Sequence, residues 1–149
     1  MKLFLIVLIF ITFSCGPKKN QQGEDINKGM ETLSLSDPRM KHAIQLAQDS
    51  LSFFADAFEK FHDKTEYNFF VKTDLNKDND SEPIWAKPYL MSDKKFQCVL
   101  DSNPRTIAGY KFGDTIQISF ESIEDFMIIL GDSVVGNYLQ KELKKPSAQ

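Results

Sequence analysis

The pattern of apolar and polar residues divides the chain into three stretches. Residues 3–11 are all apolar, residues 16–35 carry few large apolar groups, and beyond them apolar positions recur with regular periods. An apolar run this short is typical of a secretory signal peptide, here residues 1–14, rather than of a helix that spans a bilayer. We therefore expect a mature protein with a lipid-anchored flexible tether over residues 15–35 and a single folded domain over residues 36–145.

Residues 37–61 have the spacing of one amphipathic helix. Asp37 is a favourable N-cap residue, and proline is favoured at the first helical position, which Pro38 would occupy. Apolar side chains then recur at alternating steps of four and three residues, at Met40, Ile44, Ala47, Leu51, Phe54, Phe58 and Phe61. The sequence therefore predicts one long N-terminal helix of about 25 residues, roughly 37 Å in length, with an apolar stripe along one side.

Beyond Glu66 the period of the apolar residues changes to two, which indicates β-strands. Polar turns separate the strands, and turns this short favour antiparallel pairing. The predicted strands are residues 67–72, 84–91, 96–101, 116–120, 126–130 and 134–143, with a short helical turn at 122–125. The fold class is therefore α+β: the long helix packs on a curled antiparallel sheet of five or six strands, for which an SH3-like half-barrel is one arrangement.

The apolar run ends in Ser14-Cys15-Gly16 and resembles a bacterial lipoprotein signal, in which a small residue precedes the modified cysteine. Thr12 and Phe13 depart from the commoner residues of that motif. The resemblance implies cleavage before Cys15, a diacylglyceryl group on its sulfur and acylation of the new amino group. Two or three acyl chains hold a protein stably on a membrane. Gly16, where Asp would signal retention in the inner membrane, favours the outer membrane, so we expect a lipid-anchored protein of the bacterial cell envelope.

Composition and charge narrow the classes of partner. The chain has 18 Lys and Arg against 21 Asp and Glu, a net charge of −3, so we expect no nucleic-acid partner, which usually requires a clustered basic face. Arginine, the usual residue of bidentate anion clamps, occurs only at Arg39 and Arg105. Once Cys15 carries a lipid, Cys98 is the one free thiol of the mature chain, which excludes an internal disulfide.

Several motifs together resemble the bacterial domain-of-unknown-function family 2314 over residues 37–143. They are Phe70-Val71-Lys72, Glu82 with Trp85, Asn103-Pro104, Gly113-Asp114 and Ile123-Glu124-Asp125-Phe126-Met127. The family pattern has a His after the Glu, where this chain has Pro83, and often a Trp where it has Phe126. The resemblance implies a fold and a bacterial setting, in the envelope or the cytosol. It implies no activity, because the family has no established one.

An acidic segment resembles the first half of a calcium-binding loop. Oxygen-bearing side chains alternate at Asp74, Asn76, Asp78, Asp80 and Glu82, and oxygen ligands suit a hard cation such as Ca²⁺. However, the glycine expected at the sixth position is Asn79, the twelfth position is Trp85, and no helix is predicted on either side. The tip of an acidic β-hairpin is the other interpretation, and we expect neither a bound metal nor another cofactor.

Four carboxylates lie at predicted strand ends. They are Glu82, Asp114, Glu124 and Asp125. Two of them could meet as a general acid and a general base. Turn and cap contacts with the backbone are the alternative role, and the one we favour.

Cys98 is the candidate nucleophile. It could pair with His42 or His62, since an imidazole activates a thiol. Its alternation with Phe96 and Leu100 instead places Cys98 on the core face, where a free cysteine behaves as a small hydrophobe.

The second predicted strand is apolar on both faces, with Trp85, Tyr89 and Met91 on one of them. Such a strand is covered on both sides, or one side is a binding surface beside the helix. The candidate interaction surface is Glu82, Trp85, Asp114 and Asp125. We therefore expect a non-enzymatic binding module for an unknown protein or envelope ligand. The alternatives are an immunity or inhibitor protein for a toxin or hydrolase, and an envelope hydrolase that uses the strand-end carboxylates.

Replacement of Cys15 should abolish lipidation, because the lipid is bonded to the cysteine sulfur. In cells labelled with an acyl-chain probe, the Cys15→Ser protein should take up no label and should leave the membrane fraction. Cys98→Ser is the matched control and should keep both the label and the membrane association. A labelled, membrane-bound Cys15→Ser protein would contradict the lipoprotein prediction.

Overall fold

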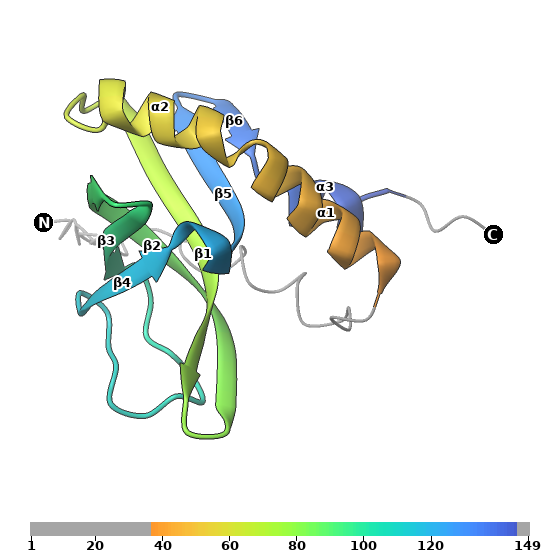
Figure 1. Cartoon of the computed structure of the whole chain (residues 1–149), viewed down its shortest axis with the longest axis vertical. Coiled ribbons are helices and arrows are strands. Elements are labelled where there is room, and N and C mark those ends of the chain that lie inside the picture. Colours follow the sequence, from red (N-terminus) through yellow and green to blue (C-terminus); the bar gives the residue numbers. More distant parts are fainter. Residues whose placement is uncertain (1–36, 146–149) are drawn as a thin grey trace, which may run out of the picture.

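The computed structural model describes residues 37–145, and the predicted signal peptide, Cys15 and the predicted tether lie outside the described residues (Figure 1). The helices are α1 (Pro38–Asp49), α2 (Leu51–Phe61) and α3 (Tyr138–Leu143). The strands are β1 (Tyr67–Lys77), β2 (Asp80–Ser92), β3 (Lys95–Leu100), β4 (Thr115–Ser119), β5 (Ile123–Leu130) and β6 (Ser133–Gly136), and the 3-10 turn η1 (Phe120–Ser122) precedes β5.

The predicted long N-terminal helix is two helices, so that prediction is wrong at its centre. Ser50 separates α1 from α2 and has φ −99° and ψ 3°. Its N–H donates to the carbonyls three and four residues earlier, and its hydroxyl accepts a hydrogen bond from the Tyr138 hydroxyl at 3.0 Å. The ψ angle of Ser50 departs from the α-helical value of about −42°, although the Phe54 N–H still donates to its carbonyl. The predicted start is confirmed, since Asp37 Oδ1 accepts a hydrogen bond from the Arg39 N–H at 2.9 Å.

The two helices share the sheet but differ in their other partners. α1 packs against α3 through Met40, Ala43 and Leu139, and it also lies against β5, where Ala47 joins the main core. α2 lies on the sheet and contributes Phe54 and Phe58 to the main core. None of the helices in the described part of the chain is long and apolar enough to cross a membrane.

All strand pairs are antiparallel in the order β4-β3-β2-β1-β5-β6, which confirms the class α+β with an open six-stranded sheet. The first hairpin is longer than predicted, because pairing continues until Lys77 faces Asp80. Asp78 and Asn79 form its turn, and Asp78 adopts φ 55°, a left-handed conformation that aspartate tolerates. The short helical turn predicted at 122–125 lies two residues earlier, as η1. The SH3-like half-barrel stays a prediction.

The predicted last strand, 134–143, is wrong beyond its first residues. β6 ends at Gly136, and the chain then turns into α3. Gly136 and Asn137 have φ values of 81° and 56°, which do not occur in a continuing strand. A Cβ atom on Gly136 would lie 2.2 Å from the carbonyl oxygen of Phe126. This turn therefore requires glycine.

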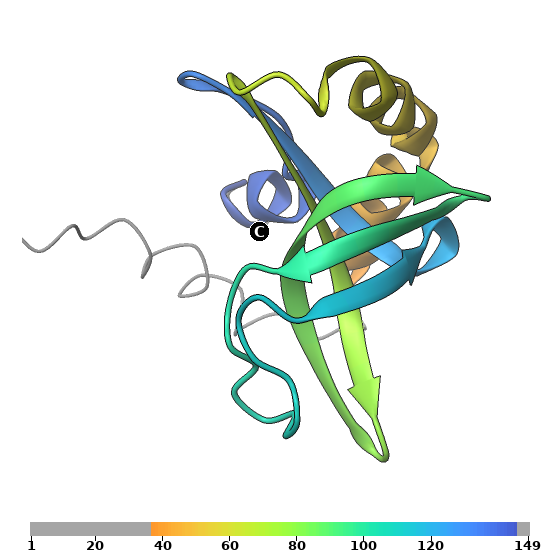
Figure 2. The ribbon, with the colours of Figure 1, turned by 90° about the vertical axis from the view of Figure 1, so that its left-hand side faces the viewer.

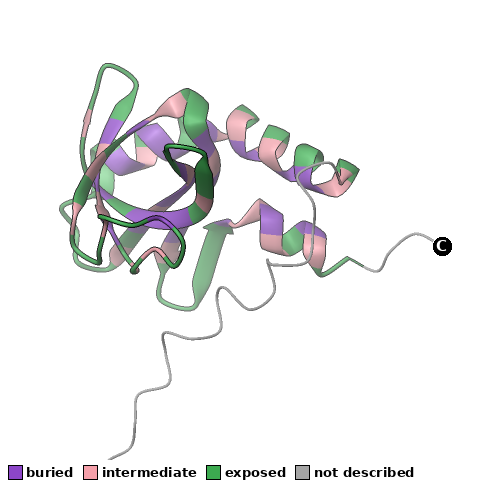
Figure 3. Cartoon of the chain, turned by 90° about the horizontal axis from the view of Figure 1, so that it is seen from below, coloured by how far each residue is buried: buried purple, intermediate pink, exposed green. Residues whose placement is uncertain are grey.

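The sheet curls round α2. The Phe54 ring lies 5.6 Å from the Phe96 ring on β3 and 4.8 Å from the Phe126 ring on β5, measured between ring centroids. In the ladder β3 and β5 are three strand spacings apart, about 14 Å in a flat sheet. Contact of one ring with both strands therefore requires strong curvature. Figure 2 shows the strands bending beside the helices, and Figure 3 shows them curving round buried positions.

Phe54→Ala should destabilise the domain by about 3–5 kcal/mol, the usual cost of truncating a buried phenylalanine. The Phe54 side chain is completely buried and contacts rings on β1, β3 and β5. Phe112→Ala is the matched control, because Phe112 is 62% exposed in the loop before β4, and it should cost less than about 0.5 kcal/mol. Urea unfolding measures both values. Equal losses in the free energy of unfolding for Phe54→Ala and Phe112→Ala would contradict the central position of Phe54 in the core.

Candidate functional site

Glu82 holds the loop between β3 and β4. Its carboxylate accepts hydrogen bonds from the N–H groups of Arg105 at 2.8 Å, Thr106 at 2.8 Å and Ile107 at 3.4 Å, and from the Thr106 hydroxyl at 2.9 Å. Partial burial raises the pKa of Glu82, but these hydrogen bonds outweigh it and bring the pKa below its ordinary value. Ile107 is thereby seated in the main core. This predicted surface residue therefore anchors a loop.

Asp125 caps α3 from inside the protein. It is completely buried; its Oδ1 accepts hydrogen bonds from the N–H groups of Phe126 at 2.8 Å and Tyr138 at 3.1 Å, and its Oδ2 accepts one from the Leu139 N–H at 2.9 Å. Asn137, at the usual N-cap position, makes no side-chain cap bond, so Asp125 satisfies the N–H groups of the helix in its place. Burial raises the pKa of Asp125, and the three hydrogen bonds oppose that rise.

A charged row crosses the face of the sheet that points away from α2. Lys72 on β1 lies opposite Trp85 on β2 and opposite Asp125 on β5. Lys72 is only 3% exposed, and its Nζ lies 3.6 Å from Glu124 Oε2. Burial raises the pKa of Glu124, and the Lys72 ammonium opposes that rise. Trp85 Nε1 is buried without a hydrogen-bond partner. On this face, the Lys72 ammonium is therefore paired with the Glu124 carboxylate, and the indole N–H of Trp85 has no acceptor.

The four residues of the predicted interaction surface do not meet at one place. Glu82 lies on the core face of the sheet, whereas Trp85 and Asp125 lie on the opposite face. Asp114 lies in the turn before β4, where its Oδ2 accepts a hydrogen bond from the Lys111 N–H at 2.9 Å. Glu82 and Asp125 therefore do not face each other, as a general acid and base acting on one substrate would. These three carboxylates make turn and cap contacts with the backbone, the role that we favoured. The fourth strand-end carboxylate, Glu124, instead forms an ion pair with Lys72.

The candidate calcium ligands are divided between the two faces of the β1–β2 hairpin. Asp74 and Asn76 lie on one face, Asp80 and Glu82 lie on the other, and Asp78 occupies the turn. Side chains that alternate across a strand in this way cannot converge on one ion. Over residues 37–145, no group of three or more His, Cys, Asp or Glu side chains could hold a metal ion.

Cys98 lies in the core, as its alternation predicts. It is completely buried, and burial raises the pKa of its thiol to about 12, so it is protonated at neutral pH and a poor nucleophile. His62 Nδ1 lies 2.9 Å from the Phe58 carbonyl oxygen, and its ring stacks on the Phe58 ring. His42 is exposed on α1. The described residues thus contain no thiol–imidazole pair of the kind that activates a cysteine.

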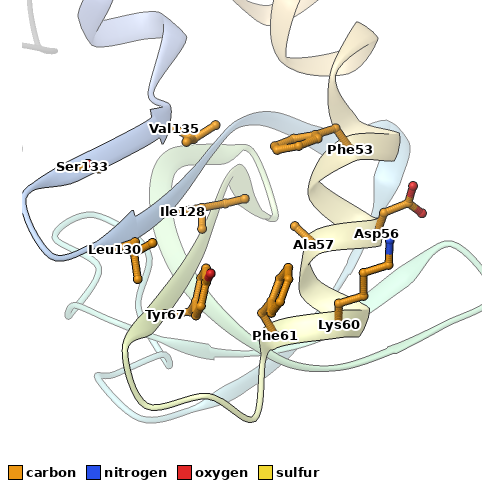
Figure 4. Close-up of a pocket in the computed structure, with 10 residues that line it drawn as sticks. All are labelled: Phe53, Asp56, Ala57, Lys60, Phe61, Tyr67, Ile128, Leu130, Ser133 and Val135. Atoms are coloured by element: carbon orange, nitrogen blue, oxygen red, sulfur yellow. The ribbon is translucent and has the colours of Figure 1, made fainter.

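An apolar groove of about 380 Å³ opens between α2 and the β5–β6 edge of the sheet (Figure 4). We call it the α2–β6 groove. Its apolar lining is Phe53, Ala57 and Phe61 on α2, Tyr67 on β1, and Ile128, Leu130 and Val135 on β5 and β6. Phe53 is 55% exposed and Val135 is 43% exposed. The Phe61 and Tyr67 rings stack with their centroids 4.8 Å apart, which closes one end of the groove with rigid aromatic surface.

Sequence reasoning did not find the α2–β6 groove. The available signals were Phe53, which widens the apolar stripe of the helix, and the pair Val134 and Val135 beside a tight turn. From the sequence, Phe53 is interpreted as a core residue, and the two valines are interpreted as part of a strand. The groove exists because the curled sheet leaves the outer side of α2 uncovered at this edge, and that is a property of the tertiary fold.

Comparisons with known proteins identify relatives of this chain. Residues 37–148 match the family model described as "Uncharacterized protein conserved in bacteria (DUF2314)". The chain is also similar to "Uncharacterized protein YegJ" of Escherichia coli (strain K12), with 24% identity over 138 residues, which cover 93% of this chain and 85% of the relative. No solved structure matches.

Asp125→Asn should destabilise the domain by about 1–3 kcal/mol, the cost of an unsatisfied buried hydrogen-bonding group. An amide cannot present two acceptor atoms to the N–H groups of Tyr138 and Leu139. Asp114→Asn is the matched control and should cost less than about 1 kcal/mol, because its hydrogen bond lies in an exposed turn. Thermal unfolding measures both. An Asp125→Asn protein as stable as the wild type would contradict the capping role.

Proposed function

Because the chain belongs to the bacterial family DUF2314, as its motifs predict, we propose that it is a non-enzymatic binding module held at the cell envelope by a lipid on Cys15. The outer membrane is the favoured location, since Gly16 follows the modified cysteine. The folded domain is the part that captures a protein or another envelope ligand.

The observation that carries this proposal is the α2–β6 groove. It is apolar, open, and bordered by side chains that are exposed although they are large, such as Phe53 and Leu130. A groove of about 380 Å³ lies in the size range of ligand sites. Exposed apolar patches on soluble domains mark interaction sites, because leaving them in water costs free energy.

The arrangement of the carboxylates supports binding rather than hydrolysis. Glu82, Asp114 and Asp125 each accept hydrogen bonds from backbone N–H groups, so their oxygens are occupied by the fold itself. The α2–β6 groove has Asp56 as its one carboxylate. A hydrolase of the kind considered above needs two carboxylates aimed at one substrate.

The predicted tether suits a binding module on a membrane. A flexible chain of the length of residues 15–36 extends roughly 25 Å between its ends. The domain could then turn the α2–β6 groove toward partners in the same membrane or beside it.

A photo-cross-linking amino acid in place of Phe53 should capture a discrete partner in intact cells, because this side chain borders the groove and is 55% exposed. The same amino acid in place of Phe112 is the matched control, since Phe112 is at least as accessible, at 62%, but lies in the loop before β4. Gel shifts and mass spectrometry identify the adducts. No adduct, or identical adducts from both positions, would contradict a binding role for the groove.

A further inference from the structure

β6 is a free edge of the described sheet. It pairs with β5 on one side, and no described strand lies on its other side. A free edge presents backbone N–H and C=O groups to which another strand can bind, and proteins usually protect such edges with lysine, proline or a bulge. The sequence of β6 is Ser133-Val134-Val135-Gly136, with no charge, no proline and no register shift against β5. β6 is only four residues long, which itself limits pairing, but it carries no lysine, no proline and no bulge.

Two β-branched side chains are exposed on this edge. Val134 and Val135 are each 43% exposed, although valine favours the pleated surface of a sheet. Val135 pairs with Ile128 and lines the groove, and Val134 points to the opposite face. The other described edge, β4, exposes the polar residues Thr115 and Gln117. The two edges therefore differ in chemistry.

The free edge and the groove are parts of one surface. α2 forms one wall, β6 forms the other, and side chains from both point into the space between them (Figure 4). A strand added beside β6 would place every second side chain on the face that carries Val135, because side chains alternate along a strand. Those side chains would enter the groove and contact Phe53 and Ala57.

We propose that β6 accepts an extended segment of another protein as an additional strand, and that alternate apolar side chains of this segment fill the α2–β6 groove. The inference rests on the proposed binding function and adds the class of partner. Main-chain hydrogen bonds to β6 supply affinity, and the groove selects apolar side chains at every second position. The segment needs no fixed fold of its own, only an extended stretch free to pair.

The N-terminal segment of the same chain is a poor occupant. α1 begins at Pro38, and Phe53, where the groove begins, lies about 22 Å farther along the helices. A chain that leads back from Pro38 covers about 3.4 Å per residue at most, so at least about seven residues are used before the groove is reached. Residues 16–30, which precede them, have Ile26 and Met30 as their large apolar side chains. They do not supply an apolar group at every second position.

A second copy of the chain is also a poor occupant. Pairing β6 with β6 joins four residues from each copy, whereas stable interfaces use about 20–30 residues a side. In such a pair the side chains of Ser133 and Val135 would face the groove of the partner. One valine and one serine fill little of a groove of about 380 Å³. A separate segment with larger apolar side chains matches the space better.

Random peptides displayed on phage test the proposal, selected against the mature chain carrying Cys15→Ser. We expect the enriched peptides to share apolar residues at alternate positions. Val135→Lys should weaken their binding by at least about tenfold, because it puts a charge on the edge and in the groove. Gln117→Lys, a lysine on the other edge at a position that is also exposed, should leave the affinity within about twofold. Thermal unfolding verifies that both variants are folded.

Methylation of the peptide backbone gives a second test on the unchanged protein, which decides the matter if Val135→Lys fails to fold. Methyl groups on every second nitrogen should abolish binding in one register, because those N–H groups face β6, and should be tolerated in the other. The proposal is overturned if no peptide is enriched, if the enriched peptides lack apolar residues at alternate positions, or if peptides methylated in either register bind equally. It is also overturned if sedimentation shows a dimer that Val135→Lys dissociates. If the peptide tests fail but Phe53 still gives a specific cross-link, the extended-segment partner is wrong and the proposed binding function stands. If the peptide tests and the cross-link from Phe53 both fail, both proposals are wrong.

Discussion

The contact of one phenylalanine ring with three strands determines the shape of this domain. Phe54 projects from α2 and touches Phe69, Phe96 and Phe126, which belong to strands that a flat sheet would hold too far apart for one ring to reach. The sheet must therefore curl round α2. The curl closes the core on the side of β3 and leaves α2 uncovered on the side of β6, so the same packing that stabilises the domain also creates its groove.

The charged residues that were candidates for catalysis or binding instead stabilise this shape. Asp125 caps α3, Glu82 fixes the long loop after β3, and Lys72 is paired with Glu124 on the far face of the sheet. Buried polar groups of this kind need partners, because an unsatisfied one costs about 1–3 kcal/mol. The proposed binding function is therefore assigned to the apolar edge, where Phe53 and Val135 are exposed.

Local signals explain which parts of the fold were predictable. The cap at Asp37 and the alternation at Phe96 and Cys98 are readable from neighbouring residues, and the structure confirms them. The break at Ser50 was not readable, because the apolar stripe continues through it and Tyr138, whose hydroxyl donates to Ser50, is distant in sequence. α3 depends likewise on remote contacts with the Asp125 carboxylate, and the groove depends on the curvature of the whole sheet.

Contacts between aromatic rings in solution test the central claim most directly. Nuclear Overhauser effects between specifically labelled phenylalanine rings report which of them lie within contact distance. A sheet curled round α2 predicts cross-peaks from the Phe54 ring to both the Phe96 and the Phe126 rings, at centroid distances of 5.6 Å and 4.8 Å. Cross-peaks from Phe54 to one of these strands and not to the other would contradict the curl, and with it the origin of the α2–β6 groove.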